Sequence, residues 1–238
     1  MWLWILATTA AYFIKGLCGF ANTLVFTSIL AFGTTNINIS PVELLIGYPS
    51  NIILTLKNRK KLDHKIWIPL AILVLMGNIP GALLLRNADP GYIKVVFGVV
   101  IILLGIEMFL REQNKIRLKE SRAMLFVIGL LSGVLCGLFG IGALLAAYLG
   151  RVTDNGEAFK ANISAVFIVE NTFRVILYSV LGIITLASLK QVALMLPFML
   201  IGLYAGMGSS KILNEKKAKY LVILLLIISG VMMIAKNV

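Results

Sequence analysis

Apolar runs of about 20 residues recur along the whole chain, and no other feature restricts its fold as much. A helical run of this length crosses the hydrocarbon core of a bilayer at about 1.5 Å per residue. Charged residues make up 13% of the chain, about half their usual share in soluble domains, and the polar stretches between runs are short. The sequence therefore predicts an all-α polytopic membrane protein, multi-pass in the cell (inner) membrane.

Two of the runs carry glycines near their middle. The segment "GLCGF" begins at Gly16 inside the run 2–33, and "GLFGIG" begins at Gly137 inside the run 123–149. Glycine costs about 1 kcal/mol relative to alanine inside a helix, so we expect each run to form a broken helical hairpin. The other runs predict full transmembrane helices at 41–56, 66–86, 91–110, 161–181, 190–210 and 217–236.

The two halves of the chain share this plan. The hairpin segments align at an offset of 121 residues, and "GNIPGALLLRNADPGYIKVVFGVVIILLG" from Gly77 aligns with "GLYAGMGSSKILNEKKAKYLVILLLIISG" from Gly202 at an offset of 125. We therefore predict a first transmembrane repeat at 1–110, a basic cytoplasmic linker at 111–122 and a second repeat at 123–238. Each repeat consists of one hairpin and three transmembrane helices.

Lysine and arginine indicate the orientation, because they gather in cytoplasmic loops. If both glycine-bearing runs are hairpins, the loops 57–65, 111–122, 151–160 and 211–219 lie inside with 16 of the 22 basic residues, against 4 outside. A single crossing by 123–149 gives a weaker ratio of 12 to 8. The count favours hairpins, outward termini and two repeats of opposite orientation, the inverted-topology plan of many secondary transporters.

The hairpin turns are the first candidate for a binding site. The second arms are expected to start near Gly19–Asn22 and near Gly140–Ala143. A helix start presents free N–H groups and a partial positive charge, so two starts meeting at mid-depth would suit an anion. For Gly19, Gly140 and Gly142 we favour unwound turns facing a central cavity. The alternative is close helix packing, which we favour for the glycines at 129, 133 and 137.

Polar side chains inside the runs are the second candidate. Lys15 precedes the first turn, and Glu170 and Arg174 lie four residues apart on one helix face. Arg174 is predicted to be an anion ligand, with Glu170 as its partner or as a proton carrier. The alternative is an ion pair that only neutralises itself. Asn51 and Asn171 occupy matching places in the two halves, where they suit either a ligand or ordinary interhelical hydrogen bonds.

Other residue types exclude several functions. The single histidine, His64, lies in a basic loop, and Cys18 and Cys136 lie inside apolar runs, so neither a metal site nor a disulfide framework is predicted. No HExxH or GxSxG motif is present, which argues against an enzyme. Glu43 and Glu107 are expected near span ends, in solvated positions. The net charge of +12 is attributed to membrane orientation and not to nucleic-acid binding.

These residues resemble a known family. The stretches "GLLSGVLCGLFGIGALL" and "AFKANISAVFIVENTFRVILY" in the second half, and "YFIKGLCGFANTLVF" and "ISPVELLIGYPSNIIL" in the first, are similar to the TauE/SafE sulfite-exporter family of membrane permeases. The resemblance covers nearly the whole chain and implies ion-coupled transport of small sulfur-containing or organic anions. The sequence departs from the family where a glycine triplet is replaced by Gly142-Ala143-Leu144 and the usual following proline is absent.

The sequence therefore favours a secondary transporter of a small anion, such as sulfite, an organosulfonate or a related organic anion, coupled to an ion or to protons. The alternatives are a membrane-embedded enzyme and a structural membrane protein without transport. The expected partners are the anion and the lipid bilayer, with a homodimer also compatible, and no cofactor is expected. The candidate substrate-binding residues are Lys15, Gly19, Asn22, Asn51, Gly140, Gly142, Asn171 and Arg174, with Glu170 as the coupling or ion-pair residue.

Overall fold

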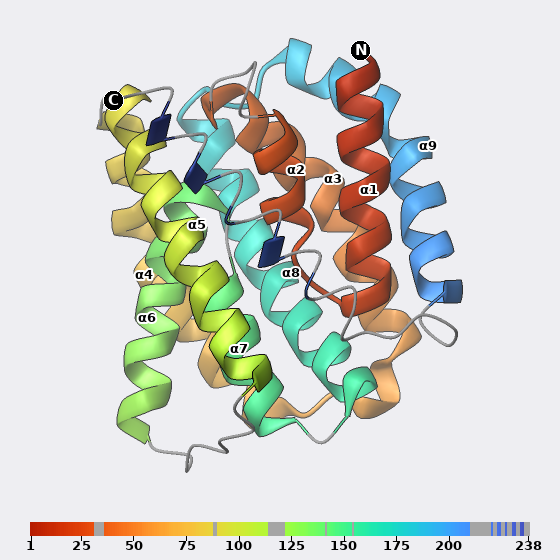
Figure 1. The fold of residues 1–238 in the computed structure, drawn as a ribbon, viewed down its shortest axis with the longest axis vertical. Helices are drawn as coiled ribbons and strands as arrows, with labels where there is room; N and C mark the ends of the chain where they lie inside the picture. Colours follow the sequence, from red (N-terminus) through yellow and green to blue (C-terminus); the bar gives the residue numbers. More distant parts are fainter. Residues whose placement is uncertain are drawn as a thin grey trace.

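The computed structural model describes residues 1–30, 36–87, 90–113, 122–140, 142–153 and 155–209, and isolated positions between 220 and 235 (Figure 1). The expected loops at 111–122 and 211–219 and the expected helix at 217–236 fall largely outside these residues. The described part of the chain is helical and contains no strand. Its helices are α1 (Trp2–Cys18), α2 (Asn22–Leu30), α3 (Asn36–Lys57), the short 3-10 helix η1 (Arg59–Lys61), α4 (His64–Asn87), α5 (Pro90–Gln113), α6 (Arg122–Phe139), α7 (Ala143–Val152), α8 (Gly156–Val180) and α9 (Leu186–Ser209).

Four of these helices are long and apolar enough to cross a membrane, judged over the described residues alone. The matching segments are Ile39–Lys57, His64–Gly81, Gly156–Val180 and Leu186–Ser209. Two shorter apolar helices cover Trp2–Cys18 and Leu125–Leu138. This composition confirms a polytopic helical membrane protein.

Both expected helix breaks are present. α1 ends where Gly19 adopts a left-handed φ of 87° and donates its N–H to the carbonyl of Lys15. α6 ends in the same way at Gly140, where φ is 69° and the N–H donates to the carbonyl of Cys136. Glycine favours this conformation because it has no Cβ to clash with the backbone. The second arms start at Asn22 and Ala143, as expected.

The two broken helices form hairpins that point in opposite directions. In Figure 1, α1 runs down from the upper end of the molecule and α2 returns upward, whereas α6 rises from the lower end and α7 descends. The loop between α8 and α9 lies at the upper end, and the loops after α3 and α7 lie at the lower end. A hydrogen bond between the N–H of Asp63 and the side chain of Asn162 joins the two lower loop regions.

Glycines bring helices from different halves of the chain into close contact. A Cβ at Gly206 of α9 would collide with the backbone of Phe13 in α1, and one at Gly81 of α4 would collide with the backbone of Val134 in α6. The glycines at 129 and 133 pack against Leu73 and against Val74 and Gly77, and Gly137 lies next to Gly81. The packing role expected for the glycines of α6 is therefore confirmed.

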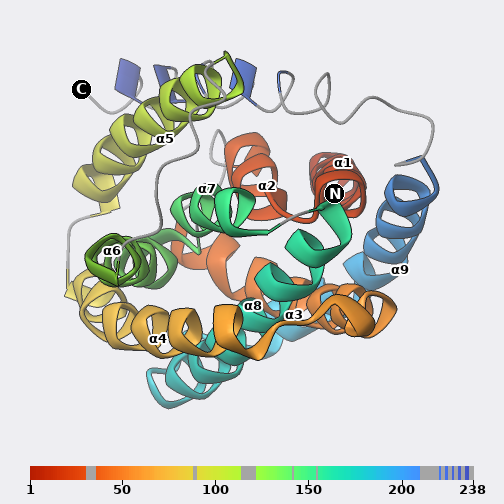
Figure 2. The ribbon, with the colours of Figure 1, turned by 90° about the horizontal axis from the view of Figure 1, so that it is seen from below.

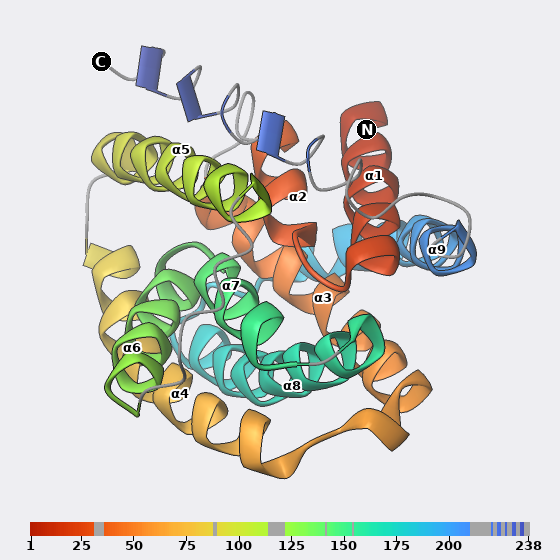
Figure 3. The same cartoon turned by 60° about the horizontal axis from the view of Figure 1, so that its bottom comes forward.

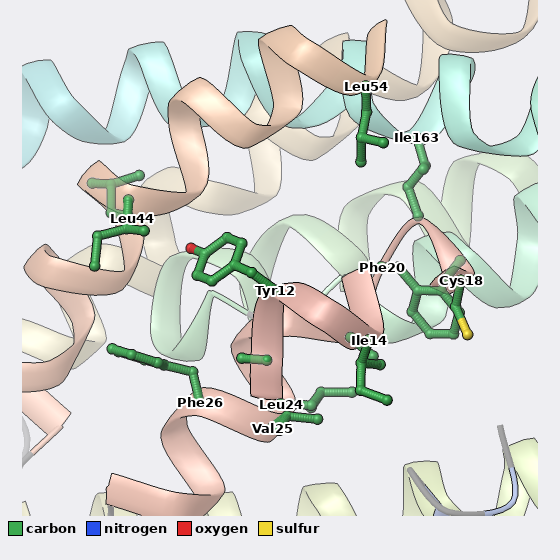
Figure 4. Packing of buried hydrophobic residues seen from close by; sticks show 14 of the residues in the cluster. Tyr12, Ile14, Cys18, Phe20, Leu24, Val25, Phe26, Leu44, Leu54 and Ile163 are labelled. Atoms are coloured by element: carbon green, nitrogen blue, oxygen red, sulfur yellow. The ribbon is translucent and has the colours of Figure 1, made fainter. Parts of the chain in front are cut away.

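The two short arms lie inside the molecule. Figure 2 and Figure 3 show α2 and α7 between α3 and α8 on one side and α5 on the other. The apolar side chains around them form one core cluster. Figure 4 shows Tyr12, Phe26 and Leu44 in this cluster, with Leu54 and Ile163 next to each other at its other end. The core thus holds both helix breaks in place.

Candidate functional site

The start of α2 lies against the second break. A Cβ built on Gly140 would lie 3.2 Å from the Thr23 side chain and 3.0 Å from Nη1 of Arg174. The left-handed φ of Gly140 independently disfavours any other residue there. The first turn of α2, the end of α6 and the Arg174 guanidinium therefore meet at one point.

Arg174 links three helices at this point. Its Nη1 donates to Oε1 of Glu170 and to the carbonyl of Cys136, both at 3.1 Å, and its Nη2 donates to Oγ of Ser40 at 3.4 Å. The guanidinium also lies 5.3 Å from the centre of the Tyr178 ring. The side chain is 2% exposed, and its Nε has no hydrogen-bond partner among the described residues. Because Cys136 is in the last turn of α6, the arginine also stabilises the negative end of that helix dipole.

The expected pair of Glu170 and Arg174 is a direct ion pair in the structure. It extends to α4, because Nδ2 of Asn78 donates to the same Glu170 oxygen at 2.7 Å. Asn78 is fully buried, and its Oδ1 has no partner in the part of the chain that the structure describes. Glu170 is thus held by one charged donor and one neutral donor.

The expectation that Glu43 is solvated near a span end is wrong. Its side chain is 4% exposed, and Oε1 accepts hydrogen bonds from Nδ2 of Asn22 and Oγ1 of Thr23, both at 2.7 Å. The cause is the helix boundary: α3 begins at Asn36 and not near 41, which places position 43 about 10 Å inside the helix. The side chain of Glu107, the other acid expected at a span end, lies outside the described residues.

Lys15 completes a set of four buried charges. It is 1% exposed, and its Nζ lies 5.8 Å from the centre of the Tyr12 ring. The ammonium interacts electrostatically with Glu43 but forms no hydrogen bond with a residue that the structure describes. Among those residues, the buried side chains of charged types are Lys15, Glu43, Glu170 and Arg174, so the centre contains two basic and two acidic residues.

The other candidates lie at varied places. A Cβ at Gly19 would meet Lys160, which precedes Arg174 by about 21 Å along α8, so the first break itself lies away from the arginine. A Cβ at Gly142 would collide with the ring of Phe167. Asn51 and Asn171 are both buried, and Oδ1 of Asn51 has no partner among the described residues. The structure therefore brings together Asn22, Gly140, Glu170 and Arg174, with Lys15 acting through its charge.

Sequence reasoning missed several members of this cluster. Each of them contacts a predicted residue: Thr23, Ser40, Glu43, Asn78 and Tyr178. Asn78 had a usable signal, because it is a lone amide inside an apolar run, where an unpaired polar group is costly. The hydroxyls had none, since serine and threonine also bond to their own helix backbone.

Broken helices that meet around buried charges inside a polytopic helical protein define the class of membrane transport proteins. The model of the sulfite exporter TauE/SafE family matches residues 4–233, and the chain belongs to this family. The resemblance read from the glycine-rich segments is thereby confirmed. Neither a curated protein nor a solved structure matches the chain.

Proposed function

We propose that the protein is a secondary transporter that carries a small oxyanion, sulfite or an organosulfonate, and that couples its movement to an ion gradient. The observation that supports this most is the place of Arg174, where the start of α2 meets the end of α6. The family description names sulfite, and the buried arginine suits an anion of this kind. A charge inside a membrane span is costly and is usually kept for function.

We further propose that the two halves are inverted repeats. Adding 121 to positions in α1 gives positions in α6, and subtracting 125 from positions in α9 gives positions in α4. Under these shifts, the close contacts of one pair of helices become those of the other. The corresponding contacts are Gly202 on Thr9 and Phe13, matching Gly77 on Leu130 and Val134, and Gly206 on Phe13, matching Gly81 on Val134. The correspondence between the α1–α9 contacts and the α6–α4 contacts supports a common ancestry of the two halves.

The chemistry of the centre fits an oxyanion. A guanidinium can donate two parallel hydrogen bonds to two oxygens of a sulfite or sulfonate group. The starts of α2 and α7 add partial positive charge, and Gly140 leaves the backbone open to a close approach. To bind a ligand in this way, Arg174 has to exchange some of its bonds to Cys136 and Ser40 for bonds to the anion.

Ligand-induced stabilisation of the purified protein tests this proposal, because an anion that binds only the folded state raises its stability. We expect sulfite and methanesulfonate to raise the unfolding temperature, and chloride at equal ionic strength to have less effect. Arg174→Gln should lose most of the shift. Arg59→Gln, which removes an exposed arginine in η1, is the matched control and should keep it. A normal shift in Arg174→Gln, or no shift with any anion in the unmodified protein, would refute the proposal.

A further inference from the structure

The structure assigns a second role at the same centre to Glu43, an acid that the sequence analysis did not select. We propose that its carboxylate is a tethered competitor of the substrate: it occupies the donors at the start of α2, and it must take up a proton before a substrate anion can bind there. This inference rests on the proposed transport function and adds to it the group that exchanges the proton.

The position of the carboxylate is that of a bound anion. Oε1 of Glu43 accepts from the side chains of Asn22 and Thr23, which are the first two residues of α2. A negative group at this end of a helix is stabilised by the partial positive charge of the helix start. Glu43 belongs to a different helix, α3, so its carboxylate contacts the start of α2 from outside that helix, as a bound ligand anion would.

The balance of buried charges explains why a carboxylate would take up a proton when an anion binds. Counted in their ionised forms, the buried residues Lys15, Arg174, Glu43 and Glu170 have charges that sum to zero in the described part of the chain. A bound monoanion would leave the buried centre with a net charge of −1, and an uncompensated buried charge is strongly unfavourable. One proton on a carboxylate restores neutrality. It also frees the two donors of α2, because a neutral carboxyl is a weaker acceptor than a carboxylate.

The two acids are not equivalent as proton acceptors. Glu170 contacts the Arg174 guanidinium directly at 3.1 Å, so protonating it would remove the direct counter-charge of the arginine. Glu43 is held by neutral donors, and Lys15 and Arg174 act on it only at longer range. Lys15 is then left without a direct hydrogen-bonded counter-ion among the described residues, and the incoming anion supplies one.

The groups that surround Glu43 define what else could titrate. α1 presents Lys15 and Tyr12, α8 presents Glu170 and Arg174, and α6 presents Cys136. α2 presents only neutral donors, and the described part of α9 contributes no charge that acts on Glu43. A Cβ at Gly47 would lie at ordinary contact distance, 3.5 Å, from Oε1 of Glu43 and from the Tyr12 hydroxyl, so the glycine leaves space for about one methyl group beside the carboxylate.

Proton counting during ligand binding tests the inference. The probe is methanesulfonate, which stays fully ionised, so that any proton taken up goes to the protein. Isothermal titration in two buffers of different ionisation enthalpy gives the number of protons bound per anion. We expect about one proton in the unmodified protein and, by linkage, an affinity that falls about tenfold for each unit of increasing pH.

Three variants locate the proton. Glu43→Gln should bind the anion without proton uptake and with an affinity that no longer depends on pH. Glu170→Gln should change the affinity but keep the uptake of about one proton. Glu157→Gln, which alters an exposed acid in the first turn of α8, is the control for removing a surface carboxylate and should behave like the unmodified protein.

Each outcome is decisive. Binding without proton uptake in the unmodified protein overturns the role of Glu43 while leaving the transport proposal intact, and this holds even if Glu43→Gln does not fold. Uptake that persists in Glu43→Gln, or that is lost in Glu170→Gln alone, also overturns it. If neither methanesulfonate nor sulfite binds at all, the transport proposal fails, and this inference fails with it.

Discussion

Gly206 offers the sharpest test of how the helices pack. Its Cα lies against the Phe13 carbonyl of α1, and a Cβ added there would also approach the backbone of Leu17. The obstacle is backbone, so it cannot rotate away as a side chain could. We therefore expect Gly206→Ala to push α1 and α9 apart by up to about 1.5 Å, the shortfall from an ordinary non-bonded contact.

Overpacking of this kind costs about 1–3 kcal/mol, and alanine returns about 1 kcal/mol through its better helix propensity. Gly208 provides the matched control, because it lies two residues further along the same helix and a Cβ there meets nothing within 4 Å. Gly208→Ala receives the same propensity gain without the clash. The two variants should thus differ by about 1–3 kcal/mol in the free energy of unfolding.

Unfolding of the purified protein in rising SDS, followed by circular dichroism, measures this difference. Gly81→Ala in α4, whose Cβ would meet Val134 in the corresponding way, should lose a similar amount if the two halves are equivalent. Equal stabilities of Gly206→Ala and Gly208→Ala would show that α1 and α9 are not in this close contact, and the packing argument would then be wrong.

Two further predictions concern the backbone and the orientation. Ala21 adopts a left-handed φ of 70° in the first break, so Ala21→Gly should stabilise the protein by about 1 kcal/mol in the same unfolding assay, and a loss of stability would contradict this. The charge count predicts that the basic loops are cytoplasmic. Cysteines introduced at Lys60 and Glu157 should therefore be labelled from the cytoplasmic side by an impermeant maleimide, and one at Ala187 from the outside. Labelling of Lys60→Cys and Glu157→Cys from opposite sides would refute the hairpin of α6 and α7.

The helix breaks could be predicted because their cause is local. A glycine in the middle of an uncharged run weakens the helix there, whatever packs around it. Glu43 could not be placed in this way. The apolar runs predicted a span over 41–56, whereas α3 begins at Asn36 and contains Pro41 as an interior residue. Because α3 begins five residues earlier than the expected span, Glu43 lies in the buried centre and not near the surface.

Only part of the cluster around Arg174 could be predicted from the sequence. Its pairing with Glu170 follows from their spacing on one helix, and it is present. Its bonds to Cys136 and Ser40 join positions that are far apart in the chain, and they depend on how α3, α6 and α8 are arranged. Such contacts are fixed by tertiary packing, so a single sequence gives no local pattern from which to read them.

The pairing of α1 with α9 sets a condition on biosynthesis. α1 is translated first, but the atoms nearest to a Cβ on Gly16 belong to Leu203, Gly206 and Met207 of α9. At about 5–20 residues per second, roughly 10–40 s pass between the synthesis of α1 and that of α9. During this time the glycine face of α1 has to be shielded by lipid or by the insertion machinery. The amino-terminal half alone therefore cannot complete its own packing, and separately synthesised halves should associate with each other in the membrane.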